Sequence, residues 1–372
     1  MSEAAPGDGP VKTAREKSFP CDACGAQLTF SIGAQQLRCD HCGAEKALVF
    51  EDGARVVERD LAAALRKQGA QRASATPTTT EHEVRCKSCG ATVVFQGSLT
   101  SSECSYCGGP LQRESAHQTQ GRLPVDGICP FAVERATAKE HLRRWVESRW
   151  FAPTSFTTST VREKFDGVYI PYFTFDAMTF TRYRGERGDA YYVKEKHGDQ
   201  ERSVRKVAWS SRSGALQRFF DDVCIPALTS LPAGLLTSLE PWPLERVIPF
   251  TDQALAGKRA HTYEVELADS FRAARARMDL EILADVRGEI GGDEQRVHSV
   301  DTNCTALTYK HILLPAWILA YRFHGKAYRV VVNAMTGEVS GERPWSAPKI
   351  AAAVVVALAV LWVLMSMGGR QH

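Results

Sequence analysis

The sequence predicts an α+β protein that starts with two Zn(Cys)4 zinc ribbons and ends with one transmembrane helix. Three observations lead to this fold class. A C-x2-C quartet occurs twice in the first third of the chain, and an apolar run occupies residues 350–367. Between them, residues 122–345 mix helical and strand periodicity. We therefore expect an antiparallel sheet with helices in this middle region.

The two quartets share the frame C-x2-C-G-A-x3-F followed by C-x2-C-G. Two cysteines two residues apart on a tight turn direct both sulfurs at one ion, and a second turn completes a tetrahedron. The spacing predicts two structural Zn²⁺ ions, one in a ribbon over residues 19–48 and one in a ribbon over residues 84–113. The predicted ligands are Cys21, Cys24, Cys39, Cys42, Cys86, Cys89, Cys104 and Cys107.

Two other interpretations of the quartets stay open. The same cysteines could form disulfides, and His41 could replace one cysteine ligand. Four thiolates around a dication carry a charge of −2, so two centres would change the formal net charge from +3 to about −1. The chain then has no overall basic field to attract a phosphate backbone. Thiolate sites indicate a reducing compartment, and we expect Cys129, Cys224 and Cys304 to be small buried side chains.

Residues 1–18 contain no apolar run, so they predict a disordered leader that is not a signal peptide. Residues 49–83 predict a short helix capped by Asp60, followed by a polar linker. Within residues 122–345, Thr137 to Glu140 matches a capping box at the start of a helix. A second helix over 269–287 places Ala274 and Met278 on one face, with an arginine stripe opposite that we expect to be solvated.

The stretch between these helices is rich in Tyr, Phe and Thr and contains several glycines. We expect short strands over 168–183, 190–196, 203–209 and 215–219, separated by glycine-containing turns in an antiparallel meander. Similar Pro-Phe pairs at 130–131 and 249–250 precede each helix-and-strand block. The α+β domain could therefore consist of two related halves.

The C-terminal segment 350–367 has one polar member, Ser366. As a helix it would be about 27 Å long, close to the roughly 30 Å of a bilayer core. It predicts a membrane span, with the lipid bilayer as a partner through residues 350–367. Because no signal peptide is expected and thiolate sites need a reducing compartment, we expect a tail-anchored, single-pass inner-membrane protein with a cytoplasmic N-terminus.

Motifs that carry catalysis are missing from the sequence. Residues 256–259 lack the first glycine and the hydroxyl of a phosphate loop, and no HExxH, GxSxG or Rossmann glycine pattern occurs. Asp221 and Asp222 are neighbours on a predicted strand, so we expect them to point to opposite faces. Four cysteine ligands leave no open coordination position for a catalytic water. The sequence predicts a protein with no catalytic or cofactor-binding residues, other than metal ligands.

Long segments of the chain resemble bacterial TFIIB-type zinc-ribbon proteins that carry labels such as "primosomal protein N′ (replication factor Y)" or helicase-like. The matching residues are the two quartets and the segments 168–176, 183–188, 218–222 and 313–344. The resemblance implies a membrane partner of a phage-shock-type stress system that helps to recruit a peripheral membrane-remodelling protein. The helicase label does not fit a chain without a nucleotide-binding motif.

Three functions compete at this point. The first is an adaptor that docks cytosolic or membrane-peripheral proteins at the inner membrane surface, and it best fits ribbons, anchor and missing motifs together. The second is nucleic-acid binding by the ribbons, which offer only Arg38 and Lys46 in the first and Arg85, Lys87 and Arg113 in the second. The third, an enzyme in the middle domain, has the least support.

Overall fold

The computed structural model of the chain describes residues 19–50, 54–74, 81–85, 92–95, 101–103, 110–112, 116–119, 123–153, 165–197, 200–323 and 326–368. Within these ranges, side chains are described except at 71–119, 196–201, 259, 320–327 and 363–368. The leader predicted over residues 1–18 lies outside the described residues. The same holds for four predicted zinc ligands, Cys86, Cys89, Cys104 and Cys107.

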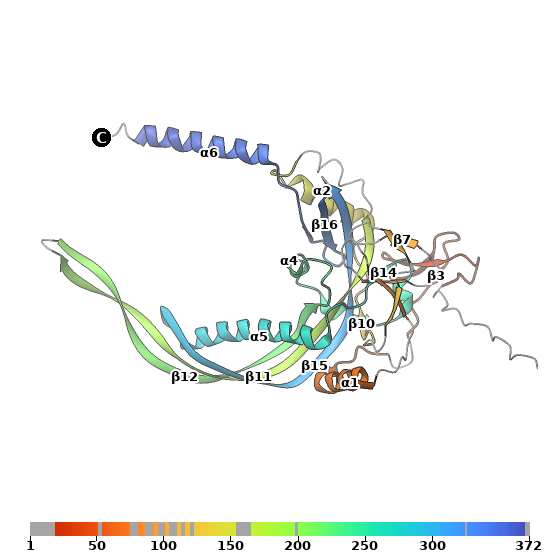
Figure 1. Cartoon of the computed structure of the whole chain (residues 1–372), viewed down its shortest axis with the longest axis horizontal. Helices are drawn as coiled ribbons and strands as arrows, with labels where there is room; N and C mark the ends of the chain where they lie inside the picture. The colour runs from red at the N-terminus through yellow and green to blue at the C-terminus, as the bar shows by residue number, and fades with distance from the viewer. Residues whose placement is uncertain are drawn as a thin grey trace, which may run out of the picture.

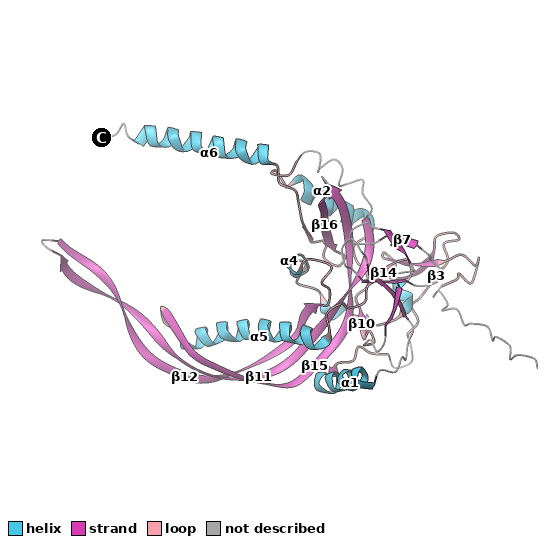
Figure 2. Ribbon diagram, in the orientation of Figure 1, coloured by secondary structure: helices cyan, strands magenta, loops and turns pink. Residues whose placement is uncertain are grey.

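Three very long strands dominate the molecule (Figure 1). They are β11 (Phe165–His197), β12 (Gln200–Pro226) and β15 (Glu294–Phe323), of 33, 27 and 30 residues. They lie side by side in the order β12-β11-β15, with both pairings antiparallel. At roughly 3.3 Å per residue, β11 follows a path of about 110 Å. Figure 2 shows that this curled sheet, and not a balance of helices and strands, defines the architecture, so the predicted α+β class is wrong.

The antiparallel pairing expected for residues 190–196 and 203–209 is confirmed, as the ends of β11 and β12. The division into short strands is wrong, because Gly185, Gly188 and Gly214 lie inside continuous strands. Gly188 of β11 pairs with Trp209 of β12, and an added Cβ there would lie 2.7 Å from the side chain of Val207. At Gly185 an added Cβ would collide with the carbonyl oxygen of Arg296 on β15. These glycines permit close approach of neighbouring strands. The sequence signal was therefore a packing requirement and not a turn.

We divide the long strands into two regions. The base comprises residues 165–177 of β11 and 308–319 of β15; the arm comprises residues 178–197 of β11, 200–219 of β12 and 294–305 of β15. The pairing of β15 with β11 ends at Gly188 and Glu294, so only β11 and β12 remain paired in the arm tip, residues 189–197 and 200–208. Figure 1 shows the arm curving away from the rest of the molecule.

Shorter strands extend the sheet at the base. Strand β16 pairs with β15 and then with β17, β10 lies parallel to β15, and β13, β14 and β4 add two-residue pairings. Their bounds are β4 (Arg59–Asp60), β10 (Gly127–Ile128), β13 (Ile248–Pro249), β14 (Arg259–Ala260), β16 (Lys326–Asn333) and β17 (Val339–Gly341). Separate small sheets contain β1 (Leu28–Ser31), β2 (Gln36–Cys39) and β3 (Glu45–Lys46), and β5 (Glu81–Arg85), β6 (Thr92–Phe95), β7 (Ser101–Glu103), β8 (Pro110–Gln112) and β9 (Ala116–Thr119).

Helices pack on this sheet or, in the case of α6, project away from it (Figure 1). They are α1 (Leu61–Ser74), α2 (Arg135–Glu147), α4 (Ala233–Thr237), α5 (Leu267–Ile290) and α6 (Ala347–Gly368), with 3-10 turns η3 (Leu244–Arg246) and η4 (Asp252–Leu255). The predicted cap of α1 is confirmed, because Asp60 Oδ1 accepts a hydrogen bond from the N–H of Ala63 at 2.5 Å. The predicted capping box is wrong: α2 starts earlier, at Arg135, and its N-cap Glu134 makes no side-chain cap.

The predicted transmembrane helix at 350–367 is wrong. The segment does form the helix α6, but within the described residues no helix is both long and apolar enough to cross a membrane. The predictions of a tail anchor, an inner-membrane location and bilayer contact through residues 350–367 depended on this helix, so the structure does not support them.

Burial separates the base from the arm. In the base, consecutive residues of β11 are inaccessible on both faces: Tyr169 packs in one apolar cluster and Ile170 in another. In the arm, burial alternates, since Thr179 and Thr181 are buried while Phe180 between them is 42% exposed. The buried face of the arm packs against α5, through a shared cluster that includes its Met278 and Ile282.

Candidate metal centre

The first cysteine quartet is held by a three-stranded ribbon. Strand β1 pairs with β2 from Leu28 opposite Cys39 to Ser31 opposite Gln36, and β2 pairs with β3. The side chains of Leu28, Phe30 and Leu37 form a small core beneath the cysteines. Strand β1 thus lies between the two cysteine pairs of the quartet. A core of this size is too small to stabilise a unit of about thirty residues on its own.

Each cysteine pair lies on a tight turn with the same hydrogen bonds. The N–H of Gly25 donates to the carbonyl of Cys21 at 2.8 Å, and the N–H of Gly43 donates to that of Cys39 at 2.9 Å. Both glycines have positive φ, +73° and +76°, although nothing lies within 4 Å of an added Cβ. Their backbone conformation, and not a lack of space, therefore favours glycine after each pair.

The two turns bring all four sulfurs together. The Sγ atoms of Cys21 and Cys42 are 3.6 Å apart, those of Cys24 and Cys39 are 3.5 Å apart, and all four lie within 4.8 Å of one another. A disulfide requires about 2.05 Å between sulfurs, so the disulfide interpretation fails for this quartet. Four sulfurs at about 2.3 Å from one ion at a tetrahedron's corners are about 3.8 Å apart. The quartet therefore has the geometry to hold a metal ion.

Proton sharing among the thiols supports the same conclusion. The backbone N–H of Cys42 lowers the pKa of Cys39 to about 6. The N–H of Ala26 lowers the pKa of Cys24, but hydrogen bonds with the thiols of Cys42 and Cys39 outweigh it and raise that pKa to about 12. One thiol ionises easily while its neighbour resists, because crowded negative charges disfavour each other. A divalent cation removes this conflict by stabilising all four thiolates.

Burial within the quartet is uneven. Cys21 and Cys39, the first residue of each pair, are buried, whereas Cys24 and Cys42 are exposed. The metal-holding group contains these four cysteines and no histidine, so His41, which is exposed, does not substitute for any of them. One edge of the centre thus faces solvent while the other faces the core of the ribbon.

The ribbon packs against the rest of the described chain and is not a separate unit. The N–H of Phe30 donates to the carbonyl of Ala256 at 3.1 Å, and Ala256 is part of the ribbon's apolar cluster. Gln35 Nε2 donates to the carbonyl of Phe131 at 2.8 Å, and the N–H of Val49 donates to Gln253 Oε1 at 2.8 Å. These contacts join residues more than ninety positions apart in the chain. The sequence contained no signal for them.

A second cluster of possible ligands, Asp176, Asp221 and Asp222, lies where β11 meets β12. Neighbours on a regular strand would diverge, but Asp222 has φ +51° and the strand register shifts beside Asp176, which brings the carboxylates together. The ammonium of Lys310 lies 2.6 Å from Asp222 Oδ1. Burial lowers the pKa of Lys310, but the hydrogen bond and charge of Asp222 raise it overall. This lysine supplies the cation that the cluster requires.

The other three cysteines differ in environment. Cys129 and Cys224 are buried, as the sequence predicts, and burial raises the pKa of Cys129 to about 12. Cys304 is only partly buried, contrary to the prediction, and accepts a hydrogen bond from Arg275 Nη1 at 2.7 Å. The arginine stripe of α5 is therefore not simply solvated, although the sequence predicts that it is. Arg275 also forms an ion pair with Asp279, and Arg277 forms one with Glu240.

Comparison with known proteins places no activity on this chain. No protein-family model matches it, and no solved structure matches it. Over 273 residues the chain is 24% identical to the uncharacterized protein YdjG of Bacillus subtilis (strain 168). The similarity covers 68% of this chain and 75% of that protein.

Proposed function

We propose that the protein is a non-catalytic, zinc-stabilised scaffold that docks partner proteins along its arm. In this proposal Cys21, Cys24, Cys39 and Cys42 bind one structural Zn²⁺. The second quartet, Cys86, Cys89, Cys104 and Cys107, repeats the spacing of the first and binds another. Four cysteine ligands favour Zn²⁺ over harder cations and leave no open position for substrate.

Zinc binding is tested by Cys39→Ser, because Cys39 is the fully buried member of the second turn. We expect the purified protein to lose one zinc ion per chain, measured by elemental analysis, and the ribbon to detach from the sheet. Structural zinc contributes on the order of 10–16 kcal/mol in small modules. The matched control is Cys304→Ser, which removes a partly exposed thiol outside the quartet. Unchanged zinc content in Cys39→Ser would contradict the assignment.

The observation that carries the docking proposal is the arm tip. There β11 and β12 pair without a third strand, from Asp189 opposite Ala208 to His197 opposite Gln200. Tyr191 and Tyr192 are neighbours on β11, so their side chains point to opposite faces of the ribbon. They are 49% and 70% exposed, which means that neither face is covered at this position. An isolated two-stranded ribbon is marginally stable in water. Exposed tyrosines on such a ribbon are typical of interface anchors, since Tyr is enriched at binding hot spots.

The outer edge of the arm also supports docking of a protein. Strand β12 is the last strand in the sheet order, so its far side offers backbone N–H and C=O groups for another strand. Among known recognition modes, addition of a strand to an open edge uses such groups for affinity. A partner that contacts both the edge and the tyrosines would bury the part of the arm that the chain itself leaves uncovered.

Nucleic-acid binding has weaker support as the alternative. The ribbon cation Lys46 pairs with Asp22 at 2.8 Å, and the arm cations Arg205 and Lys206 pair with Glu294 and Glu195, both at 2.6 Å. Cations already neutralised by carboxylates gain less from phosphate contacts and counterion release. A salt-dependent shift of labelled DNA or RNA by the full chain would favour this alternative, and no shift at low salt would remove it.

The docking proposal is tested by site-specific photocrosslinking in cells. A photoreactive residue replaces Tyr192 in the arm tip, and the control carries it at Trp150, which is 72% exposed near α2 at the base. We expect discrete adducts with a protein partner at position 192 that disappear when Tyr191→Ser is added. The same adducts at position 150, or none at position 192, would contradict docking at the arm.

A further inference from the structure

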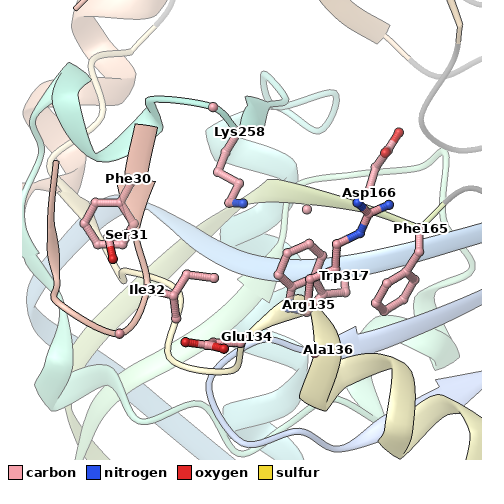
Figure 3. A pocket seen from close by; sticks show the side chains of 13 residues that line it. Phe30, Ser31, Ile32, Glu134, Arg135, Ala136, Phe165, Asp166, Lys258 and Trp317 are labelled. Carbon is pink, nitrogen blue, oxygen red and sulfur yellow. The ribbon is translucent and has the colours of Figure 1, made fainter. Parts of the chain in front are cut away.

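A pocket of about 400 Å³ lies where the ribbon meets the base (Figure 3). Its walls come from five separate segments: the end of β1, the start of α2, the start of β11, the loop that carries Lys258, and Trp317 of β15. The volume lies at the lower end of the range for small-molecule sites, roughly 300–1,000 Å³. Neither the metal centre nor the docking arm uses this pocket.

Lys258 is the unusual residue in this pocket. Its Nζ lies 4.9 Å from the ring centroid of Trp317 and 5.2 Å from that of Phe131. Among the described residues it has no ion pair with a carboxylate and no hydrogen-bond acceptor. Figure 3 shows its amine pointing into the pocket. An ammonium group has three donors, and contact with two aromatic faces satisfies its charge only in part.

The surroundings of Lys258 add positive potential. Burial, and then the charge of Arg135, lower the pKa of Lys258 below its usual value. Arg135 is the first residue of α2, whose N-cap makes no side-chain hydrogen bond. The first N–H groups of a helix have no intrahelical partner, and the helix dipole favours an anion at this end. Two cations and a helix N-terminus thus share one pocket.

Acidic residues occupy the rim and do not neutralise Lys258. Glu134 lies beside the ribbon loop, where an added Cβ on Gly33 would be 3.3 Å from its Oε1. Asp166 lies on the same side of the pocket as Arg135 (Figure 3). The pKa of Lys258 is shifted by burial and by Arg135, with no contribution from either carboxylate.

The other wall of the pocket is aromatic. The rings of Phe165 and Trp317 stack at 5.5 Å with an interplanar angle of 18°, and Phe30 from the ribbon lines the same space. Gly167 lies beneath them, where an added Cβ would be 3.0 Å from the Trp317 ring and 3.2 Å from the Lys258 side chain. These rings are only 1–5% exposed, so the surface that a ligand can reach in the pocket is mainly the polar surface around Lys258 and Arg135.

We propose that this pocket binds a small molecule through a phosphate or carboxylate group. Lys258 binds the oxyanion, and Arg135 and the first N–H groups of α2 add positive potential. The buried rings of Trp317 and Phe131 hold the Lys258 side chain at the pocket wall. Because residues 30–33 of the ribbon form one wall, the ligand contacts both ribbon and base. Phosphate and carboxylate groups both present negatively charged oxygens to Lys258. The titration below distinguishes which of the two binds more strongly.

The test is calorimetric titration of the full chain with phenyl phosphate, benzoate, inorganic phosphate and uncharged phenol. We expect phenyl phosphate or benzoate to bind and phenol not to bind. The stronger of the two anions identifies the ligand class, and binding of inorganic phosphate measures the contribution of the charged group alone. Absence of binding by both aromatic anions at millimolar concentration would overturn the proposal.

Two variants locate the site. Lys258→Gln should weaken the aromatic anion by about tenfold or more, because it removes a charged hydrogen-bond donor. Ala136→Phe, on an exposed position of the first turn of α2, should block the pocket without touching a charge or the core. The matched control, Arg272→Gln, removes a 79% exposed cation on α5 and should bind as the original chain does. Equal affinity in all three variants would place any binding elsewhere and refute the assignment.

Discussion

The base and the arm are built from the same strands, yet their side chains meet different surroundings. In the base, Tyr169 and Ile170 are neighbours on β11 and both are inaccessible, because apolar clusters cover both faces of the sheet. In the arm, only the face toward α5 is covered, and at the tip Tyr191 and Tyr192 are both exposed. Continuous strand pairing therefore does not imply a continuous core. The base provides the stability, and the tip presents a surface.

The largest effect of this difference is expected at Trp317 in the base. Its ring is 2% exposed, stacks on Phe165, and its Nε1 donates to the carbonyl of Val133 at 2.9 Å. Trp317→Ala should lower the free energy of unfolding by about 3–5 kcal/mol, since it leaves a large cavity. Chemical denaturation measures the loss, and Trp317→Phe is the conservative control. A loss below about 1 kcal/mol would show that the base is not the main core.

A smaller effect is expected where α5 covers the arm. Met278 is inaccessible and packs with Phe175 and Ile282 in the cluster between the helix and the sheet. Met278→Ala should cost about 2–5 kcal/mol. We expect the lower end of that range because the arm has only one covered face. Met278→Leu should be nearly neutral, and hydrogen exchange should show that Met278→Ala loosens the arm before the base.

A pH-dependent effect is expected beside the base, at Asp126, which accepts a hydrogen bond from the N–H of His311 on β15 at 3.0 Å. Asp126 is buried and its Oδ1 lies 2.5 Å from Arg59 Nε. Burial raises the pKa of Asp126 above its usual value, more than the N–H of His311 and Arg59 lower it. The folded chain therefore holds this proton to higher pH than the unfolded chain. Its contribution to stability is fully present below the usual pKa and is lost as pH rises through the folded pKa.

The measurement compares the original chain with Asp126→Asn, which cannot titrate at this position. The difference in unfolding free energy between them should decrease as pH rises from about 3.8 toward neutral. An equal difference across that window would show that the pKa of Asp126 is not raised on folding. Glu140→Gln is the comparison of opposite sign: the hydrogen bond from Arg143 at 3.0 Å lowers the pKa of Glu140, so the contribution of Glu140 to stability is lost as pH falls.

The smallest effect on stability is expected at the arm tip. Replacing Tyr191 and Tyr192 with Ser should change the free energy of unfolding by no more than about 0.5 kcal/mol, since both rings are already exposed. In the chain that carries the photoreactive residue at position 192, Tyr191→Ser should abolish the partner adducts. A large loss of stability would mean that the tyrosines serve the fold, and the contrast between base and tip would then fail.

Several features followed from local sequence. The C-x2-C-G frame places two sulfurs on each tight turn, because glycine at positive φ lets the chain turn back after each pair. The spacing of Ala274, Met278 and Ile282 identified the buried face of α5, since residues four apart lie on one side of a helix. Asp60 marked the start of α1 through its side-chain cap. Each of these depends on residues within a few positions of one another.

Tertiary structure decided the remaining features. The glycines at 185 and 188 signal turns when read locally, but they are required for close contact between strands that lie far apart in sequence. Likewise, the hydrophobic run before residue 367 matched a membrane span, although no described helix qualifies as one. The pocket around Lys258 uses five segments that only the folded chain brings together. Local sequence could determine the cysteine quartet and the helix faces, whereas long-range packing determined the curled sheet, the docked ribbon and the pocket between them.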